Sequence, residues 1–293
     1  MTVLFNRLVI AGVGLIGGSL GLAARERGLV REVVGFGRTA TNLKVALERG
    51  ILTSYTFDPA EAARGSDILL LAVPVEATGP VAQQFIPFLP AGCIITDAGS
   101  VKAPVVNIME LLLPSTMSFV GAHPIAGTEY SGAAAAFSTL FDNRLCVLTP
   151  TARTSPEGLA RIRALWEGVG MRVEEMDMYI HDQILARVSH LPHIIAFSVM
   201  NAIRAAYLPG VDPLAYAGSA FSDLTRVASS PVEMWRDICQ SNRDALLAAL
   251  NEFETALAQM KASIANGDKT ALSHAMDQAR TERQRLTKLR EKK

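Results

Sequence analysis

The feature that most constrains this sequence is a glycine-rich segment, GVGLIGGSLG at 12–21, directly after the first apolar run of the chain at 8–11. The glycines of its G-x-G-x-x-G pattern are Gly12, Gly14 and Gly17. Between a strand and a helix, such glycines allow a tight turn, close approach of a pyrophosphate and close helix–strand packing. The segment therefore predicts a dinucleotide-binding site, and a tight turn without a ligand is the alternative.

The acidic residue that usually selects NAD is missing. In NAD-binding folds a carboxylate about 20 residues past the glycines binds the ribose 2′-hydroxyl. The expected position is Gly37, followed by Arg38, whose guanidinium can pair with a 2′-phosphate. The sequence thus favours NADP, with NAD as the alternative. The residues expected to contact the cofactor are Gly12, Gly14, Leu15, Ile16, Gly17, Gly37, Arg38, Thr39, Val73 and Pro74.

Short apolar segments in the first part of the chain predict an α/β fold with a Rossmann-like, doubly wound sheet. They are almost unbroken in hydrophobicity, as parallel strands covered on both faces are, and helical patterns such as 41–49 separate several of them. The predicted strands are 8–11, 32–36, 67–73, 94–97, 119–121, 145–148 and 172–176. We expect a dinucleotide-binding domain over residues 1–178.

After Tyr179 the pattern changes to alanine, leucine and methionine at helical spacing. Pro192 is expected to kink the first of these helices. Helices that are apolar on several faces need a partner surface, so we expect an all-α substrate-binding and dimerisation domain over 179–293, in a homodimer. The predicted helices are 181–206, 231–265 and 270–291.

Composition argues against several function classes. The chain has 28 basic and 28 acidic residues, so it offers no basic field to nucleic acid. No apolar run approaches the ~20 residues of a membrane span, and glycines interrupt the signal-like segment 8–24. Cys93, Cys146 and Cys239 have no metal or redox spacing, which fits a reduced cytoplasmic protein.

Polar residues follow two of the predicted strands. Ser100 comes after the strand 94–97, and His123 comes after the strand 119–121. Ligands bind outside the carboxyl ends of such strands, so both side chains are expected to face one crevice. The ordinary imidazole pKa of about 6.5 suits proton abstraction from an alcohol near neutral pH, which makes His123 a candidate base.

The helical half contributes further candidates. His190 and His193 lie three residues apart, but no cysteine or acidic cluster completes a set of four ligands. We therefore predict no metal site and expect at least one of these histidines to contact substrate. Asp223 and Arg226 lie one helical turn apart. Either the two side chains form a simple ion pair on one helix, or Arg226 binds a substrate carboxylate.

Five segments, in this order and spacing, resemble the prephenate/arogenate (cyclohexadienyl) dehydrogenase family of tyrosine biosynthesis. They are GVGLIGGSLG, DAGSVK, GAHPIAGTEYSG, SHLPH and SDLTRVASSPVEMWRDI. The resemblance covers nearly the whole chain. It implies a Rossmann domain followed by a helical dimerisation domain. It also implies oxidative decarboxylation of prephenate to 4-hydroxyphenylpyruvate, or of arogenate to tyrosine, with NAD or NADP.

The same resemblance implies roles for single residues. His123 matches the histidine that takes the proton of the ring C4 hydroxyl, and Ser100 matches the serine that orients it. Arg226 matches the arginine that binds the ring carboxylate, and His193 matches a residue near the substrate side chain. The other members of the polar network are Thr128, Glu129, Asp223 and Trp235. The chain departs from the family pattern at Gly37 and at Ser219.

Two other functions stay open. One is a dehydrogenase of the same architecture that acts on a β-hydroxyacid, although such enzymes usually rely on a lysine in the helical half and 181–206 contains none. The other is a non-catalytic, NADP-sensing protein, which would leave His123, Ser100 and Arg226 without a role.

Overall fold

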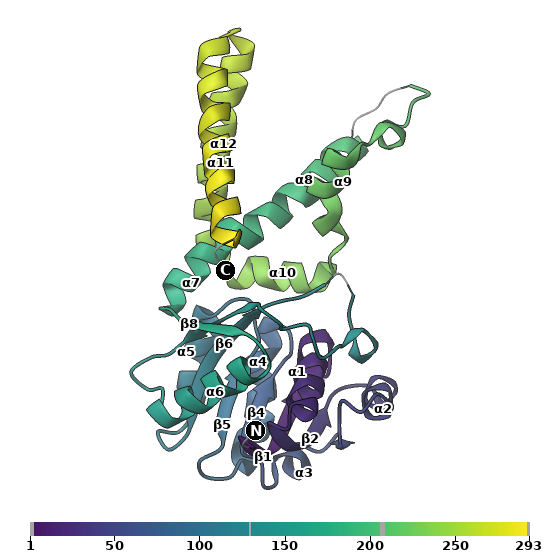
Figure 1. Ribbon diagram of the computed structural model, residues 1–293, viewed down its shortest axis with the longest axis vertical. Helices are drawn as coiled ribbons and strands as arrows, with labels where there is room; N and C mark the ends of the chain where they lie inside the picture. The colour runs from purple at the N-terminus through teal and green to yellow at the C-terminus, as the bar shows by residue number, and fades with distance from the viewer. Residues whose placement is uncertain (1–2, 129, 206–208, 292–293) are drawn as a thin grey trace. The chain divides into compact units, whose positions relative to one another are not determined.

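The computed structural model describes residues 3–128, 130–205 and 209–291, and the chain divides into two compact units (Figure 1). The first unit is Met1–Arg243 and contains the sheet. The second is Asp244–Lys293 and contains two long helices.

An eight-stranded sheet forms the centre of the first unit, in the order β3-β2-β1-β4-β5-β6-β7-β8. All neighbours are parallel except β6 and β7, which are antiparallel. The order changes direction between β1 and β4, and the carboxyl ends of these two strands therefore flank a topological switch point. The bounds are β1 Phe5–Ala11, β2 Val30–Phe36, β3 Ser54–Thr56, β4 Ile68–Leu71, β5 Ile94–Asp97, β6 Ser118–Ile125, β7 Leu145–Thr149 and β8 Arg172–Glu175.

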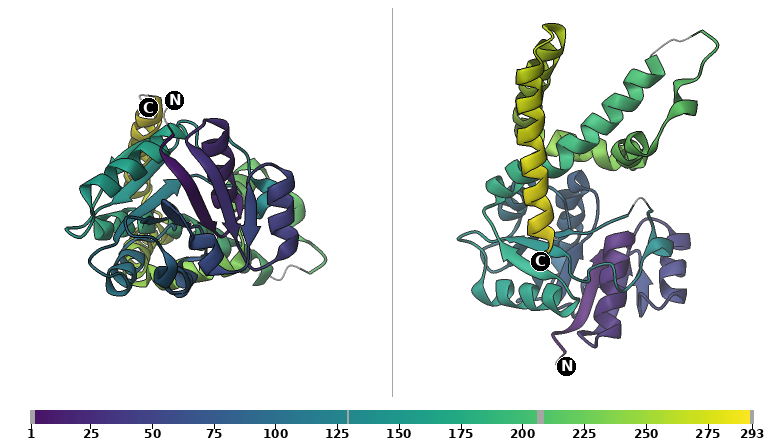
Figure 2. Two further views of the ribbon diagram at one scale, coloured as in Figure 1. Left: turned by 90° about the horizontal axis from the view of Figure 1, so that it is seen from below. Right: turned by 45° about the horizontal axis from the view of Figure 1, so that its top comes forward.

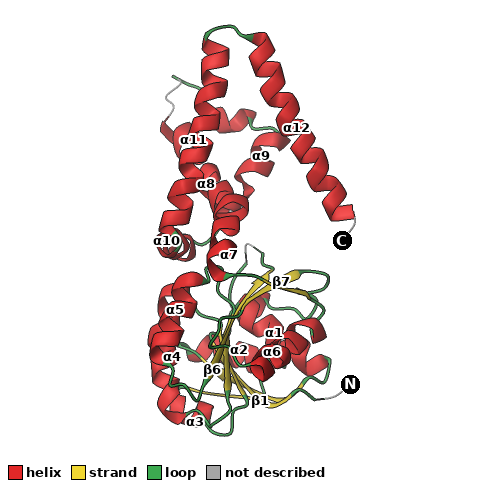
Figure 3. Ribbon diagram, turned by 90° about the vertical axis from the view of Figure 1, so that its left-hand side faces the viewer, coloured by secondary structure: helices red, strands yellow, loops and turns green. Residues whose placement is uncertain are grey.

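Helices cover both faces of this sheet, as Figure 3 shows most clearly. Because side chains alternate along a strand, β1 sends Leu8 and Ile10 into one hydrophobic core and Val9 and Ala11 into the other. The first core lies under α1 (Leu15–Glu26), α2 (Ala40–Glu48) and α6 (Pro156–Gly168), and the second under α3 (Pro59–Ala63), α4 (Thr78–Phe85) and α5 (Ala103–Leu112). Short 3₁₀ turns are η1 Val75–Ala77, η2 Ile86–Phe88 and η3 Ala133–Ala135.

The predicted Rossmann-like fold is confirmed, with two differences in its strands. The short strand β3 was not predicted, because three residues of mixed polarity carry no clear pattern. β6 is longer than predicted, and it is parallel to β5 but antiparallel to β7. Its first residues pair with β5, and Gly121–Ile125 then pair with β7 in the antiparallel sense. His123 consequently lies inside a strand instead of after one.

The first unit also contains a set of helices beyond the sheet. They are α7 Met178–Leu185, the π-helical turn η4 Ala186–His190, α8 Leu191–Ala205, η5 Pro213–Tyr216, α9 Ser219–Thr225, η6 Arg226–Ser229 and α10 Val232–Ser241. α9 returns alongside α8 (Figure 2). The helix predicted over 181–206 starts earlier, at Met178. It is interrupted by the π-helical turn just before Pro192. The proline ring crowds the preceding turn, and its nitrogen has no N–H to donate. Position 206 is outside the described residues.

Two long helices close the chain, α11 (Arg243–Ala265) and α12 (Lys269–Glu291). The single helix predicted over 231–265 is wrong, because α10 and α11 are separated at Asn242, where φ is −109° and ψ is 33°. The helix predicted over 270–291 is confirmed. α11 and α12 diverge from the turn that joins them (Figure 3). Within the described ranges, no helix is long and apolar enough to cross a membrane.

Candidate active site

The G-x-G-x-x-G segment forms the turn between β1 and α1. Gly12 has φ of +96°, which L side chains rarely adopt, and a Cβ there would overlap the carbonyl oxygen of Ala72. A Cβ on Gly17 would overlap the carbonyl oxygen of Gly12. Gly14 has no neighbouring atom within 4 Å of a Cβ position. Gly12 and Gly17 therefore permit the turn and its packing, while Gly14 leaves bare backbone open to a ligand.

The N-terminus of α1 has the properties of an anion site. Gly14 is the N-cap, makes no side-chain capping bond, and is followed by a first turn without acidic residues. The unpaired N–H groups and the helix dipole favour a phosphate at this end. Leu15 is buried in the core and Ile16 packs against it, so these residues offer a ligand their backbone. A dinucleotide pyrophosphate fits this cradle.

Asn42 of α2 holds the glycine turn in place. Its Nδ2 donates to the carbonyl oxygen of Val13 at 2.7 Å, and its Oδ1 accepts from the N–H of Ala133 at 2.9 Å. Arg49 donates to three carbonyl oxygens of the segment 133–136. α2 thus joins the turn to η3. We did not predict this role of Asn42 and Arg49, since a side chain that hydrogen-bonds to the backbone leaves no periodic pattern in the sequence.

The other predicted cofactor residues surround the carboxyl ends of β1, β2 and β4. A Cβ on Gly37, just after β2, would make ordinary contact with Leu43 at 3.4 Å. Arg38 is exposed, and Thr39 is the N-cap of α2 without a side-chain capping bond. Val73 and Pro74 follow β4, on the other side of the switch point. The contact of these residues with a cofactor stays a prediction.

His123 is buried, with 8% of its surface exposed. Its Nδ1 lies 2.8 Å from Nε2 of His181, which comes from α7. Burial lowers the pKa of His123 well below 6.5, and the neighbouring His181 and Lys102 lower it further. The imidazole is therefore neutral near pH 7, which is the form that can accept a proton.

A buried ion pair joins β5 to β6 beside His123. Lys102 is fully buried, and its Nζ donates to the Asp97 carboxylate and, at 2.8 Å, to the carbonyl oxygen of Ala122. Asp97 also accepts from the N–H groups of Ala122 and Gly99, at 2.9 and 2.8 Å. Both charges are paired and hydrogen-bonded, and this is what makes their burial tolerable. The pair fixes the backbone on the N-terminal side of His123.

Polar side chains continue from His123 into the helices. Nδ1 of His181 lies 2.8 Å from Oδ1 of Asp182. Asn242 donates from Nδ2 to the carbonyl oxygen of Asp182 at 2.9 Å and contacts Nδ1 of His190 at 3.1 Å. Burial lowers the pKa of His190 to about 4. We did not predict His181, Asp182 or Asn242 as site residues, and the adjacent His-Asp pair was the one available signal.

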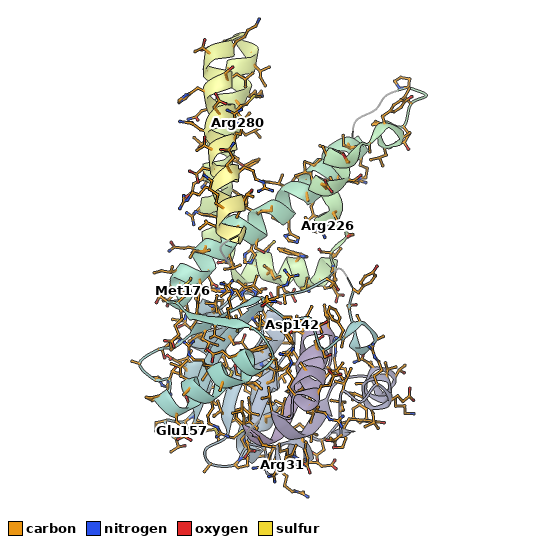
Figure 4. All side chains as sticks on the ribbon, in the orientation of Figure 1. Arg31, Asp142, Glu157, Met176, Arg226 and Arg280 are labelled. Carbon is orange, nitrogen blue, oxygen red and sulfur yellow. The ribbon has the colours of Figure 1, made fainter. Side chains whose placement is uncertain are left out.

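His193, Arg226 and Trp235 are brought together in the helical part of this unit. The imidazole of His193 stacks on the Trp235 indole, with centroids 3.6 Å apart and planes at 21°. Its Nδ1 is 2.8 Å from the carbonyl oxygen of Ser189, so Nδ1 donates there and Nε2 stays an acceptor. Burial lowers the pKa of His193; the Ser189 bond opposes this shift, and the charge of Arg226 adds to it. Arg226 lies where α9 leads into α10 (Figure 4).

Two buried ring nitrogens in the same region, Nε1 of Trp235 and Nε2 of His190, have no hydrogen-bond partner among the described residues. Buried polar atoms are nearly always hydrogen-bonded in native proteins. These two atoms are therefore candidates to bind a polar ligand.

The remaining predicted residues are less closely tied to His123. Ser100 is half-buried in the loop between β5 and α5, and Thr128 is exposed, with its Oγ1 accepting from the N–H of Tyr130 at 3.2 Å. Glu129 lies outside the described residues. Asp223 is exposed and, in the described part of the chain, forms no ion pair with Arg226. The same part contains no group of three or more His, Cys, Asp or Glu residues that could hold a metal ion.

Two family models match this chain in sequence. Residues 20–175 match the model described as prephenate dehydrogenase, nucleotide-binding domain. Residues 178–278 match the one described as prephenate dehydrogenase, dimerization domain. Together they span most of the chain, and the first begins just after the glycine turn.

Individual proteins are similar over almost their whole length. Cyclohexadienyl dehydrogenase of Zymomonas mobilis is 36% identical over 92% of this chain and 91% of its own. The crystal structure of prephenate dehydrogenase from Aquifex aeolicus, in complex with hydroxyphenyl propionate and NAD+, has a TM-score of 0.91 and 32% identity, covering 96% of this chain and 98% of that one. Synechocystis arogenate dehydrogenase has a TM-score of 0.81 and 30% identity, covering 96% and 99%.

Proposed function

This chain belongs to the prephenate dehydrogenase family, and from that premise we propose that it catalyses the oxidative decarboxylation of prephenate to 4-hydroxyphenylpyruvate, of arogenate to tyrosine, or of both. The observation that carries the proposal is the buried, neutral His123 on the same sheet as the glycine turn. A dinucleotide-binding protein without catalytic activity has no need for a desolvated base of this kind.

The dinucleotide would be held by the turn of Gly12, Gly14 and Gly17 and by the N–H groups at the start of α1. A bound nicotinamide supplies the acceptor for a hydride. We infer that NADP is preferred over NAD. The support is the lack of a carboxylate at Gly37 and the exposed guanidinium of Arg38 beside it.

In this proposal His123 accepts the proton of the substrate's ring hydroxyl. As that proton leaves, negative charge builds on the ring oxygen and favours loss of the hydride from the same carbon. Departure of the ring carboxylate as carbon dioxide then makes the ring aromatic. Ser100 is assigned to orient the hydroxyl, on the strength of its place in the DAGSVK segment. Since His123 is neutral at pH 7, no other group has to remove a proton from it first.

The substrate's carboxylates need a cation, and Arg226 is the candidate. It lies close enough to His193 for its charge to lower that imidazole's pKa. A guanidinium can bind a carboxylate through two parallel hydrogen bonds. We assign the ring carboxylate to Arg226 and the substrate side chain to His193 and Trp235. Thr128, Glu129 and Asp223 are proposed as outer members of this network, by their match to the family motifs.

We further propose that two chains form a homodimer. In α11 and α12 several large apolar side chains are exposed, and a lone chain would leave them in water. They include Leu257, Ile264, Met276 and Leu289, at 48–65% exposure. The match of residues 178–278 to a dimerization domain supports this assignment. All three cysteines are free thiols, as expected for a protein of the cytoplasm.

The experiment is a four-way assay of the purified protein with prephenate or arogenate and with NAD or NADP, following the absorbance of the reduced cofactor. Turnover with at least one pair is expected, with a larger kcat/KM for NADP than for NAD. His123→Asn, which keeps the size and polarity of the side chain but cannot act as a base near pH 7, is the matched control. Absence of turnover with all four pairs would reject the proposal.

A further inference from the structure

His181 and Asp182 are buried polar residues that the proposed reaction does not use. They are the fourth and fifth residues of α7, with 0% and 5% of their surface exposed. Burying an imidazole and a carboxylate is costly unless both are fully hydrogen-bonded. Their bonds lead to His123 on one side and to the start of α5 on the other. This continuous chain of contacts needs an explanation.

The carboxylate of Asp182 determines which nitrogen of His181 carries a proton. Its Oδ1 accepts the N–H of Lys102 and its Oδ2 accepts the N–H of Ala103, both at 2.8 Å. These two residues begin α5, and the dipole of that helix favours an anion there. An ionised carboxylate can only accept, so the remaining contact, Nδ1 of His181 at 2.8 Å from Oδ1, must be a donor.

The proton on Nδ1 of His181 then determines the state of His123. A neutral imidazole has one N–H, so Nε2 of His181 is left with a lone pair. The atom 2.8 Å from that lone pair is Nδ1 of His123, which must therefore donate. His123 is neutral, and its Nε2 accordingly carries no proton. Among the described residues, the hydrogen bond recorded for the His123 ring is the one at Nδ1, which leaves Nε2 as the nitrogen to meet a substrate.

We propose that His181 and Asp182 are positioning residues that hold His123 in its Nδ1–H tautomer, so that Nε2 is the base. The proposal rests on the function proposed above, because it concerns the proton that His123 accepts. Without these two residues, nothing would hold the proton of the His123 imidazole on Nδ1. Molecules that carry the proton on Nε2 could not accept another one there. His123 gains a positive charge once it has taken the proton, and its Nδ1–H then points to a lone pair already in place.

Other groups around the two residues leave this assignment unchanged. The ammonium of Lys102 is bonded to Asp97 and to the carbonyl oxygen of Ala122, so it does not compete for the lone pair of His181. Asn242 must direct its Nδ2 at the carbonyl oxygen of Asp182, which only accepts. That bond fixes the backbone of Asp182, and with it the carboxylate, from the side of α10.

The direct test is ¹⁵N NMR of protein labelled in its histidine rings. The chain has five histidines, and the signals of His123 are those lost in His123→Asn. At pH 7.5, couplings between ring nitrogens and ring carbon-bound protons identify which nitrogen is protonated. We expect His123 and His181 to be protonated at Nδ1. A His123 protonated at Nε2 would overturn the proposal, and this readout does not depend on whether the protein turns over any substrate.

Kinetics of two His181 variants provide a second test. His181→Phe removes the acceptor and should lower kcat at least about tenfold, with the cofactor Kd unchanged. His181→Gln retains an amide oxygen that can accept from His123 and should recover part of the loss. The matched control is His274→Phe, the same change at an exposed position on α12, which should keep the parent kcat.

A double variant separates positioning from a general loss of structure. In a His123→Asn background, His181→Phe should cause no further fall in kcat, because the side chain that it positions is gone. A further tenfold fall in that background, or a parent-like kcat in His181→Phe, would overturn the proposal. Parent protein that shows the expected tautomer but no turnover would instead reject the proposed function and leave the tautomer assignment standing. If His181→Phe does not fold, the tautomer of His123 in His181→Gln, expected at Nδ1–H, decides the question.

Discussion

Replacing Gly37 by aspartate tests how this chain distinguishes NADP from NAD. Gly37 does not adopt the left-handed conformation, and a Cβ there would lie 3.4–3.7 Å from Leu43 side-chain atoms, so Gly37→Asp needs no backbone shift. The new carboxylate would stand at the carboxyl end of β2, next to Arg38. It can accept a hydrogen bond from the ribose 2′-hydroxyl of NAD, and it repels the 2′-phosphate of NADP.

The size of the change follows from the new contact. A hydrogen bond to a charged group contributes about 1.5–3 kcal/mol, which corresponds to about 10–150-fold in kcat/KM for NAD. The kcat/KM for NADP should fall at the same time. Steady-state rates with both cofactors at saturating substrate measure the ratio, and Gly37→Asn, of similar size but uncharged, is the control that should still favour NADP. A NAD/NADP ratio in Gly37→Asp equal to that of the parent would refute the reasoning, as would a parent enzyme that strongly prefers NAD.

Four further outcomes are expected. His123→Asn should lower kcat by about 10²–10⁴ with the cofactor Kd intact; near-normal turnover would exclude His123 as the base. Arg226→Ala should raise the KM for prephenate about 10–150-fold through the loss of a charge-assisted contact, and Arg226→Lys should recover part of it; an unchanged KM would show that another group holds the ring carboxylate. Lys102→Met should lower the free energy of unfolding in urea by about 3–5 kcal/mol, because Asp97 stays buried without its cation; a loss below about 1 kcal/mol would contradict this. The pKa of His190 is about 4 in the folded chain and about 6.5 in the unfolded chain. Between these values the unfolded chain binds one more proton, so the free energy of unfolding should fall as the pH drops from 6.5 toward 4. His190→Asn should show a shallower fall, and a pH dependence identical to that of the parent would argue against the lowered pKa.

The sheet could be predicted from sequence because the hydrophobic pattern of each strand is local in the chain. Runs such as 8–11 and 68–71 are apolar on both faces, and this pattern is typical of strands in the middle of a parallel sheet. The glycine turn could be predicted for a similar reason, since the positive φ of Gly12 and the tight packing of Gly17 each require a missing side chain. Residues near these features, such as Gly37 and Arg38, were found by their distance along the chain.

The local surroundings of His123 could not be predicted in this way. β6 extends through His123 only because β7 pairs with it in the antiparallel sense, and that pairing joins residues far apart in sequence. The contact of His123 with His181 spans 58 positions, and that of Lys102 with Asp182 spans 80. On α7 itself, His181 and Asp182 look like ordinary polar residues of a helix.

The breaks in the helical half were missed for a different reason. Apolar residues recur at helical spacing on both sides of Asn242, so one helix was predicted over 231–265. The structure ends α10 there, because the Asn242 side chain bonds the carbonyl oxygen of Asp182 and contacts His190. Tertiary hydrogen bonds of this kind override local helix propensity, which is worth under about 1 kcal/mol per residue.

The most direct test of the proposed function measures carbon dioxide and reduced cofactor in the same reaction. Prephenate labelled with ¹³C in its ring carboxylate is mixed with the purified protein and NADP, and the reaction is repeated with labelled arogenate. We predict that labelled carbon dioxide and reduced cofactor appear in equal amounts from at least one substrate, and that His123→Asn slows both together. Reduced cofactor without labelled carbon dioxide would indicate a simple alcohol oxidation. If neither product appears with prephenate or with arogenate, the assignment of this chain as a cyclohexadienyl dehydrogenase is contradicted.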